Sequence, residues 1–167
     1  MRIIVNDTNI LIDLANLNLL DYFLKLEFEF HTNDFIINEL TDTEQKEKIE
    51  KIINDKQLIV AETKSEEYTA IIELQTKNLS FEDCSIWYYA QKVNGILLTG
   101  DARLRKTVEK SGIEVRGILF IFDKLVECNI IDTHTAVEKL KELISFNHRL
   151  PKTEVEKRFA LWRQEEE

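Results

Sequence analysis

Four acidic residues stand where their carboxylates could act together. Asp7 follows one short apolar run, and Asp101 follows another. Asp83 lies in the first turn of a predicted helix, and Glu39 lies near the end of a different one. In an open parallel sheet, sites form where the strands end, so we expect Asp7 and Asp101 to converge.

Convergence of such a set predicts a bound cation. Two like charges about 4 Å apart repel by ~4 kcal/mol at an effective dielectric near 20. Clustered carboxylates therefore take up protons or destabilise the fold unless a cation holds them. Oxygen ligands without His or Cys suit Mg²⁺ or Mn²⁺, so we expect one or two such ions.

Each acid alone has a structural alternative, which stays open at this point. Asp7 and Asp101 can cap the helices that follow them, and Asp83 can complement a helix dipole. Glu39 can be a solvated helix position. Two further acids, Glu82 and Asp13, are interpreted as structural.

The elements that position these acids alternate between short apolar runs and longer amphipathic segments. This alternation predicts an α/β fold, with βαβ units around a parallel sheet. Strands are predicted at Arg2–Asn6, Phe28–Thr32, Gln57–Glu62, Ile96–Thr99 and Glu114–Arg116. Helices are predicted at Leu17–Leu26, Asn33–Leu40 (capped by Asn33), Thr43–Asp55, Ser65–Lys77, the segment that Ser80 caps, Asp101–Ser111, Ile118–Cys128, Thr133–Phe146 and a final helix that Pro151 begins.

Composition narrows the class of protein. The chain of 167 residues has the length of one domain. Its net charge of −9 argues against a protein that coats nucleic acid by bulk charge. Four glycines, each isolated, exclude a phosphate-binding glycine loop or a dinucleotide motif.

Cys84 and Cys128 are interpreted as reduced, buried thiols, and no long apolar stretch occurs, so we expect a cytoplasmic protein without a membrane span.

Positive charge is concentrated late in the chain. Residues 83–125 hold seven Lys or Arg and five Asp or Glu. Arg103, Arg105 and Lys106 lie on the helix predicted after Asp101, where they could contact phosphate groups. A solvated basic helix face is the alternative.

The acidic positions also carry a family resemblance. The motifs are Asp7-Thr8-Asn9 with Leu11 and Asp13, then Glu39, then Leu79-Ser80-x-x-Asp83 with Ala90, then Leu98-Thr99-Gly100-Asp101-x-x-Leu104-Arg105. In order and spacing, over roughly residues 3–130, they resemble the four acidic motifs of PIN-domain ribonucleases, among them VapC-like toxin nucleases.

The resemblance implies a Rossmann-like three-layer α/β/α sandwich and metal-dependent cleavage of RNA. It implies that Asp7, Glu39, Asp83 and Asp101 are the catalytic, metal-binding acids, and that Asn9 and Thr99 orient them. Residues 1–130 would form the nuclease domain, and residues 131–167 a helical C-terminal extension of the same single domain. It also implies the toxin of a bacterial toxin–antitoxin pair, held inactive by a small antitoxin that inserts an Arg or Lys among the acids.

An apolar stripe in the C-terminal part suits either a homodimer surface or the core. Its members are Val137, Leu140, Leu143 and Ile144, with Phe159 and Trp162 beyond them.

Rival functions remain for a sheet of this kind. A haloacid-dehalogenase phosphatase needs Asp-x-Asp after the first strand, but position 9 is Asn. A receiver domain needs an acid where Asn6 stands. A Mg²⁺-dependent phosphatase and a catalytically silent interaction module with the PIN fold are the alternatives kept.

Overall fold

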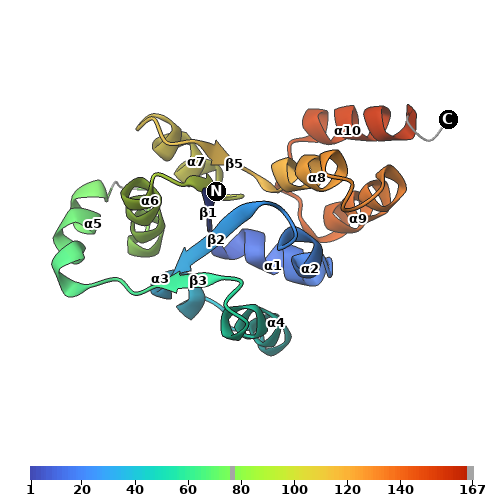
Figure 1. Ribbon diagram of the computed structural model, residues 1–167. Coiled ribbons are helices and arrows are strands. Elements are labelled where there is room, and N and C mark those ends of the chain that lie inside the picture. Colours follow the sequence, from blue (N-terminus) through green and yellow to red (C-terminus); the bar gives the residue numbers. More distant parts are fainter. Residues whose placement is uncertain (76–77, 165–167) are drawn as a thin grey trace.

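The computed structural model describes residues 1–75 and 78–164. Its strands form one five-stranded sheet in the order β3-β2-β1-β4-β5, and every neighbouring pair is parallel (Figure 1). The strands are β1 (Arg2–Asn6), β2 (Phe28–Asn33), β3 (Ile59–Ala61), β4 (Ile96–Leu98) and β5 (Val115–Arg116). All five predicted strands are confirmed, although several are shorter than predicted.

The helices connect successive strands or follow the last one. They are α1 (Thr8–Asn16), α2 (Leu20–Phe23), α3 (Asp34–Asn38), α4 (Thr43–Asn54), the 3₁₀ turn η1 (Ser65–Glu67), α5 (Tyr68–Leu74), α6 (Phe81–Val93), α7 (Ala102–Glu109), α8 (Ile118–Glu127), α9 (Thr133–Phe146) and α10 (Lys152–Gln164). The predicted caps Asn33 and Ser80 each accept a backbone N–H of the helix that follows. The predicted end of one helix at Lys77 lies outside the described residues.

The helix predicted at Leu17–Leu26 is wrong. The chain instead forms α1 directly after Asp7, and α2 is a single turn. Asn18 between them has a left-handed backbone with φ of 54°, which ends the first helix. The apolar residues of this segment are spaced as in a helix because they are buried on both sides of the turn between α1 and α2. Leu17 and Phe23, for example, are both fully buried.

The last helix also begins later than predicted. Pro151 precedes α10, and its carbonyl accepts the N–H of Val155. Proline lacks the N–H that a helix interior requires, so this flanking position suits it.

Side-chain alternation along the central strands creates two cores. Ile4 of β1 packs into one core and its neighbour Val5 into the other, and Leu97 and Leu98 of β4 divide in the same way. Residues of α1, α2, α4, α8, α9 and α10 share the core of Ile4, whereas residues of α3, α5, α6 and α7 share that of Val5. The molecule is therefore a three-layer α/β/α sandwich.

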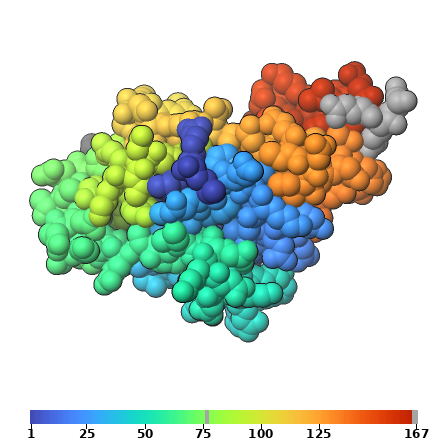
Figure 2. Space-filling model, viewed as in Figure 1, coloured from blue at the N-terminus to red at the C-terminus, as the bar shows by residue number. Residues whose placement is uncertain are grey.

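The C-terminal helices belong to the larger of these cores. Figure 2 shows the orange residues packed beside the blue N-terminal ones and the red C-terminal residues lying on the orange ones. Lys139 Nζ donates to the Leu17 carbonyl at 2.7 Å, and Trp162 stacks on Phe122 with ring centroids 6.3 Å apart. Of the apolar stripe, Val137, Leu140 and Leu143 are buried in the core, whereas Ile144 remains exposed.

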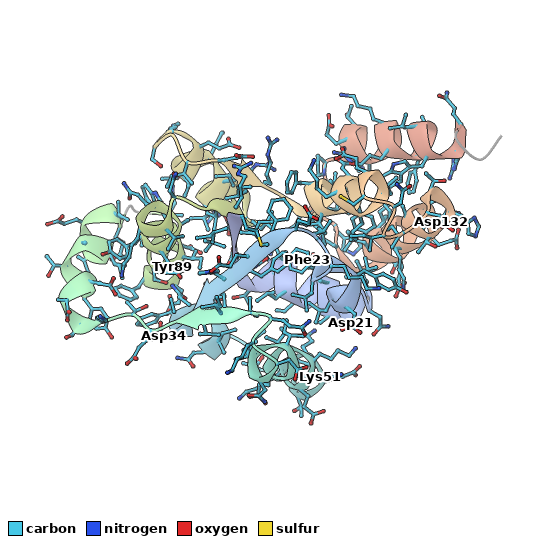
Figure 3. The ribbon with its side chains drawn as sticks, viewed as in Figure 1. Asp21, Phe23, Asp34, Lys51, Tyr89 and Asp132 are labelled. Carbon is cyan, nitrogen blue, oxygen red and sulfur yellow. The ribbon has the colours of Figure 1, made fainter. Side chains whose placement is uncertain are left out.

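Individual side chains agree with this arrangement. Phe23 lies inside the larger core, where its ring centroid is 4.3 Å from that of Phe30, while Asp21 and Lys51 are exposed (Figure 3). Cys84 is buried as predicted, but Cys128 is exposed, because it follows the end of α8 rather than lying on its apolar face. No helix in the described part of the chain is long and apolar enough to cross a membrane.

Candidate active site

Asp7 lies at the carboxyl end of β1 and caps helix α1. Its backbone N–H donates to the carbonyl of Leu98, so β1 and β4 end side by side. Its carboxylate accepts the Thr8 N–H at 2.8 Å and the Thr99 hydroxyl at 2.6 Å, with the Asn9 side-chain amide at 3.4 Å. The side chain is 5% exposed, so these donors replace most of its contact with water.

The pKa of Asp7 is raised to about 6, and burial is the main cause. The negative charges of Asp83 and Glu39 contribute to this rise, while the hydrogen bonds from Thr99 and Thr8 act in the opposite direction. The carboxylate therefore lies in a site whose negative charge is not compensated by the protein.

Glu39 reaches the same place from the end of α3. The Thr8 hydroxyl donates to Glu39 Oε2 at 2.5 Å. Burial raises the pKa of Glu39, and the charges of Glu82 and Asp83 add to this effect. The contact of Thr8 with Glu39, and the effect of Glu82 on Glu39, join residues far apart in the chain, so the spacing of the motifs does not predict them.

Asp83 joins them from the first turn of α6. Its carboxylate accepts the Ser80 N–H at 3.0 Å, and its own N–H donates to the Ser80 hydroxyl. The Asn33 side chain, which caps α3, donates to Ser85 Oγ at 3.0 Å and so links the starts of α3 and α6. Through these caps, Glu39 and Asp83 come into electrostatic contact with Asp7.

Asp101 differs from the other three acids. Its carboxylate caps α7 by accepting the N–H groups of Arg103 and Leu104 at 2.8 and 3.0 Å. The charges that raise the pKa of Asp7 are those of Asp83 and Glu39, not that of Asp101. Glu39 and Asp83 therefore lie close enough to Asp7 for their charges to act on it, whereas Asp101, at the rim, serves as the cap of α7.

Thr99 and Asn9 connect this rim to Asp7. The Thr99 hydroxyl donates to Asp7 and accepts the Asp101 N–H at 3.1 Å. Asn9 Oδ1 accepts the Gly100 N–H at 2.9 Å. Both side chains therefore lie where they can orient the carboxylate of Asp7, as the resemblance implies.

A family model described as a PIN domain matches residues 3–164 of the chain. The chain belongs to the PIN-domain family. The match continues past residue 130, so this family includes the C-terminal helices as well as the segment with the four acidic motifs.

One solved structure similar to this PIN domain is a domain of a functionally unknown protein from Methanocaldococcus jannaschii DSM 2661. The TM-score is 0.50 at 19% identity, over 70% of this chain and 91% of that chain, which shows the fold alone. No protein of curated function matches the sequence of this PIN domain. Membership of the PIN-domain family indicates that this chain has a nuclease-type fold.

The acids of this PIN domain fit a hard divalent cation by their chemistry. All of the donors are carboxylate oxygens. Within residues 1–75 and 78–164, no group of three or more Asp, Glu, His or Cys side chains is arranged so that it could hold a metal ion. Mg²⁺ commonly binds through one or two carboxylates and keeps several waters, so a site of that kind needs fewer protein ligands.

The basic residues predicted to contact RNA lie on α7. Arg103 and Lys106 are exposed, whereas Arg105 is half-buried and donates to Glu109 at 3.1 Å. Arg105 Nη1 also comes within 3.6 Å of the position that a Cβ on Gly117 would take. Arg105 therefore leans towards the start of α8, and the other two remain open to solvent.

Proposed function

We propose that this PIN domain is a metal-dependent endoribonuclease that hydrolyses RNA phosphodiester bonds, with Mg²⁺ or Mn²⁺ as its cofactor. The observation that carries the proposal is the burial of Asp7 at the carboxyl end of a parallel sheet, with Glu39 and Asp83 near enough to raise its pKa. Three acids in such a place cost stability and are explained by a cation that they hold.

Each residue of the site has a proposed task. Asp7, Glu39 and Asp83 hold the cation, and Asp101 joins them by leaving its helix cap. Thr99 and Asn9 orient Asp7, and Thr8 orients Glu39. When bound, the cation supplies Lewis-acid chemistry at the scissile phosphate.

Substrate binding is proposed for the neighbouring basic residues. Arg103, Arg105 and Lys106 follow Asp101 on α7. An RNA strand that approaches the site from the side of α7 would pass them. Guanidinium groups bind phosphate through paired hydrogen bonds, which suits a single-stranded RNA backbone.

The test is cleavage of a labelled single-stranded RNA by the full chain in Mg²⁺ or Mn²⁺. Asp7→Asn and Asp83→Asn are expected to abolish cleavage while the circular dichroism spectrum stays native. Asp21→Asn, at an exposed position on α2, is the matched control and should retain activity. Cleavage that persists in EDTA, or a fully active Asp7→Asn protein, would contradict the proposal.

The rival functions give different results in the same experiment. Hydrolysis of a generic phosphate monoester without RNA cleavage would indicate a phosphatase. A folded wild-type protein that cleaves neither substrate would indicate a catalytically silent interaction module.

The biological role proposed is that of the toxin in a toxin–antitoxin pair. Induced expression should arrest bacterial growth, and Asp7→Asn should relieve the arrest. A small antitoxin would supply an Arg or Lys to the acids, and a homodimer is the proposed assembly. Co-expression with the neighbouring gene, followed by affinity capture and light scattering, tests both partners.

A further inference from the structure

A cavity of about 480 Å³ lies beside the acids, between α1, α7, α8 and the segment before α10. Part of its wall is apolar, from Ile10, Ile118, Phe120 and Leu150. Four arginines also line it: Arg105, Arg116, Arg149 and Arg158. We call this cavity the arginine pocket. Its volume is in the range of sites for small organic ligands.

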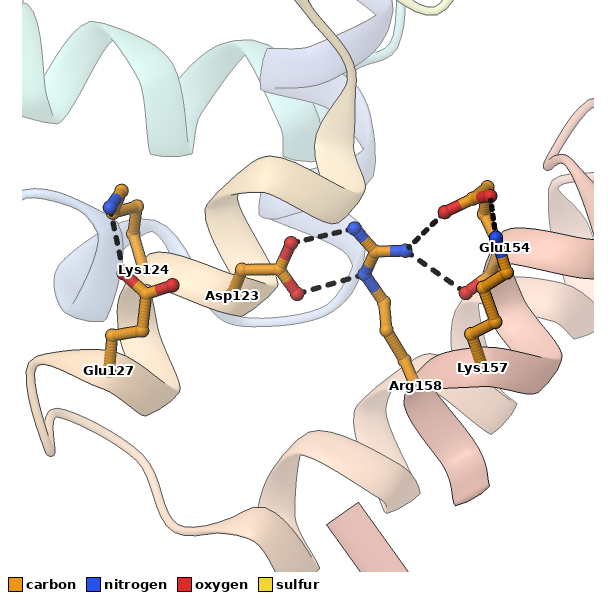
Figure 4. A network of polar contacts seen from close by, with 6 residues as sticks. All are labelled: Asp123, Lys124, Glu127, Glu154, Lys157 and Arg158. Carbon is orange, nitrogen blue, oxygen red and sulfur yellow. Dashed lines mark hydrogen bonds and ion pairs between the residues drawn. The ribbon is translucent and has the colours of Figure 1, made fainter. Parts of the chain in front are cut away.

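One of the four arginines is already neutralised. Arg158 donates to both carboxylate oxygens of Asp123 at 2.8 and 2.6 Å and also contacts Glu154 (Figure 4). Its side chain is 18% exposed, and it joins α10 to α8. Arg158 therefore builds the wall of the pocket rather than offering charge to a ligand.

The other three arginines keep their charge available. Arg105 pairs with Glu109, and Arg116 pairs with Glu114, each at 3.1 Å across solvent-exposed side chains. Exposed pairs of this kind contribute little and exchange readily with another anion. In the described part of the chain no ion pair joins Arg149 to a carboxylate. Burial raises the pKa of Asp13, which lines the same pocket, and the charge of Arg149 acts on that carboxyl in the opposite direction.

A partly buried contact fixes the loop that carries Arg149. Asn147 Nδ2 donates to Asp13 Oδ2 at 2.8 Å, and Asn147 Oδ1 accepts the Arg149 N–H at 2.9 Å. This holds the loop after α9 against α1. Arg149 also lines a shallow hollow with Gly100 and Asp101, so it faces the rim of the acidic site as well as the arginine pocket.

The pocket and the acidic site share a wall. Thr99 lines the pocket, and its hydroxyl donates to Asp7. The start of α8 opens on the same space, where Gly117 provides no side-chain cap for the free N–H groups. A ligand in the pocket would therefore experience a positive electrostatic potential, and Thr99 would separate it from Asp7.

Phe120 is the aromatic side chain that lines the pocket, and Lys124 and the ring of Phe28 also lie near its ring, at 5.7 and 6.3 Å from the centroid. Phe120 is half-buried, and the Arg116 guanidinium lies 5.5 Å from its ring centroid. Aromatic side chains stack on nucleic-acid bases with little preference for sequence, and arginines beside them hold the attached phosphate.

We propose that the arginine pocket is a nucleotide subsite, in which Arg105, Arg116 and Arg149 bind one phosphate and Phe120 with its apolar neighbours binds the attached base. The inference rests on the proposed function, because the strand would continue from this subsite to the bond cleaved at Asp7. It gives the C-terminal segment a role in substrate binding.

The test is calorimetric binding to the full chain in EDTA, so that no cleavage occurs. The probes are a nucleoside 5′-monophosphate, the corresponding nucleoside and inorganic phosphate. We expect the monophosphate to bind more tightly than either part. Arg149→Gln and Arg116→Gln should each weaken its binding by about tenfold or more, since each loses a charge-assisted hydrogen bond.

Arg163→Gln is the matched control. Arg163 lies over Phe159 at 5.1 Å, as Arg116 lies over Phe120, but it is outside the arginine pocket. Equal binding of phosphate and monophosphate, or equal losses in all three variants, would overturn the subsite.

Cleavage assays separate this inference from the proposed function. With RNA as substrate, Arg149→Gln should raise KM more than it changes kcat. If Asp7→Asn abolishes cleavage but the arginine variants alter neither binding nor KM, the subsite is wrong and the nuclease stands. If the wild type cleaves no RNA but its arginines still bind the monophosphate, the nuclease is wrong and the nucleotide site stands.

Discussion

The hydroxyl of Thr8 donates to Oε2 of Glu39 at 2.5 Å, although 31 residues separate them in the chain. Thr8 immediately follows Asp7, so one turn of backbone supplies both an acid and the donor that holds a second acid. The first turn of α1 therefore organises two of the three acids that meet at the end of the sheet.

Replacing Thr8 tests whether this contact matters for activity. Thr8→Val keeps the shape of the side chain but removes the donor, and we expect RNA cleavage to fall by about 10- to 100-fold. Thr8→Ser retains the hydroxyl and should restore most of the activity. Equal activity in Thr8→Val and wild type would show that Glu39 needs no such support.

The pKa of Asp7 predicts a pH-dependent stability. In the folded chain its pKa is about 6 against an ordinary value of 3.8, so the ionised form destabilises the metal-free fold. The folded state keeps the proton up to about pH 6, whereas the unfolded chain releases it near pH 4. Stability should therefore fall as the pH rises through this window, by about 3 kcal/mol if Asp7 acts alone.

Asp7→Asn should remove this pH-dependent loss of folding stability. In EDTA above pH 6, urea denaturation should show a variant more stable than wild type, with the difference vanishing below pH 4. Asp21→Asn is the control and should follow the wild-type curve. A wild-type stability that is flat between pH 4 and 6 would contradict the burial of an uncompensated Asp7.

A divalent cation should stabilise the wild-type fold by relieving the same repulsion. Binding at 100 times Kd contributes about 2.7 kcal/mol, which is a clear rise in Tm. The rise with Mn²⁺ should be largest in wild type and absent in Asp7→Asn. A melt of the wild type that does not respond to Mn²⁺ or Mg²⁺ would count against a metal site.

The Arg158–Asp123 pair should be the main polar link between α10 and α8. Arg158→Gln is expected to lower the free energy of unfolding by about 1–2 kcal/mol, because it breaks a bidentate, largely desolvated pair. Lys157→Gln, which loses an exposed pair with Glu154, should change it by less than about 0.5 kcal/mol. Similar effects of the two variants in urea would show that α10 is held by apolar contacts alone.

The sequence by itself determined the sheet and the positions of its acids. The apolar residues of a run such as Arg2–Asn6 point to both faces of the sheet, so both faces must be covered by helices to bury them. The alternation of such runs with amphipathic segments therefore predicts a parallel α/β sandwich. Residues that end such strands must lie at one edge. For this reason the sequence alone predicts that Asp7 and Asp101 lie at the same end of the sheet.

Only the tertiary structure decided which carboxylates face one another. A strand-end Asp can cap the next helix or project into the site, and the two conformations share the same sequence signal. Asp101 is held by its helix cap, while Asp83 keeps its capping hydrogen bond and still acts on Asp7. Likewise, Arg149 reaches the rim of the site because a partly buried hydrogen bond joins Asp13 to Asn147 across 134 residues. Contacts between such distant residues depend on how the layers pack, and local spacing carries no information about them.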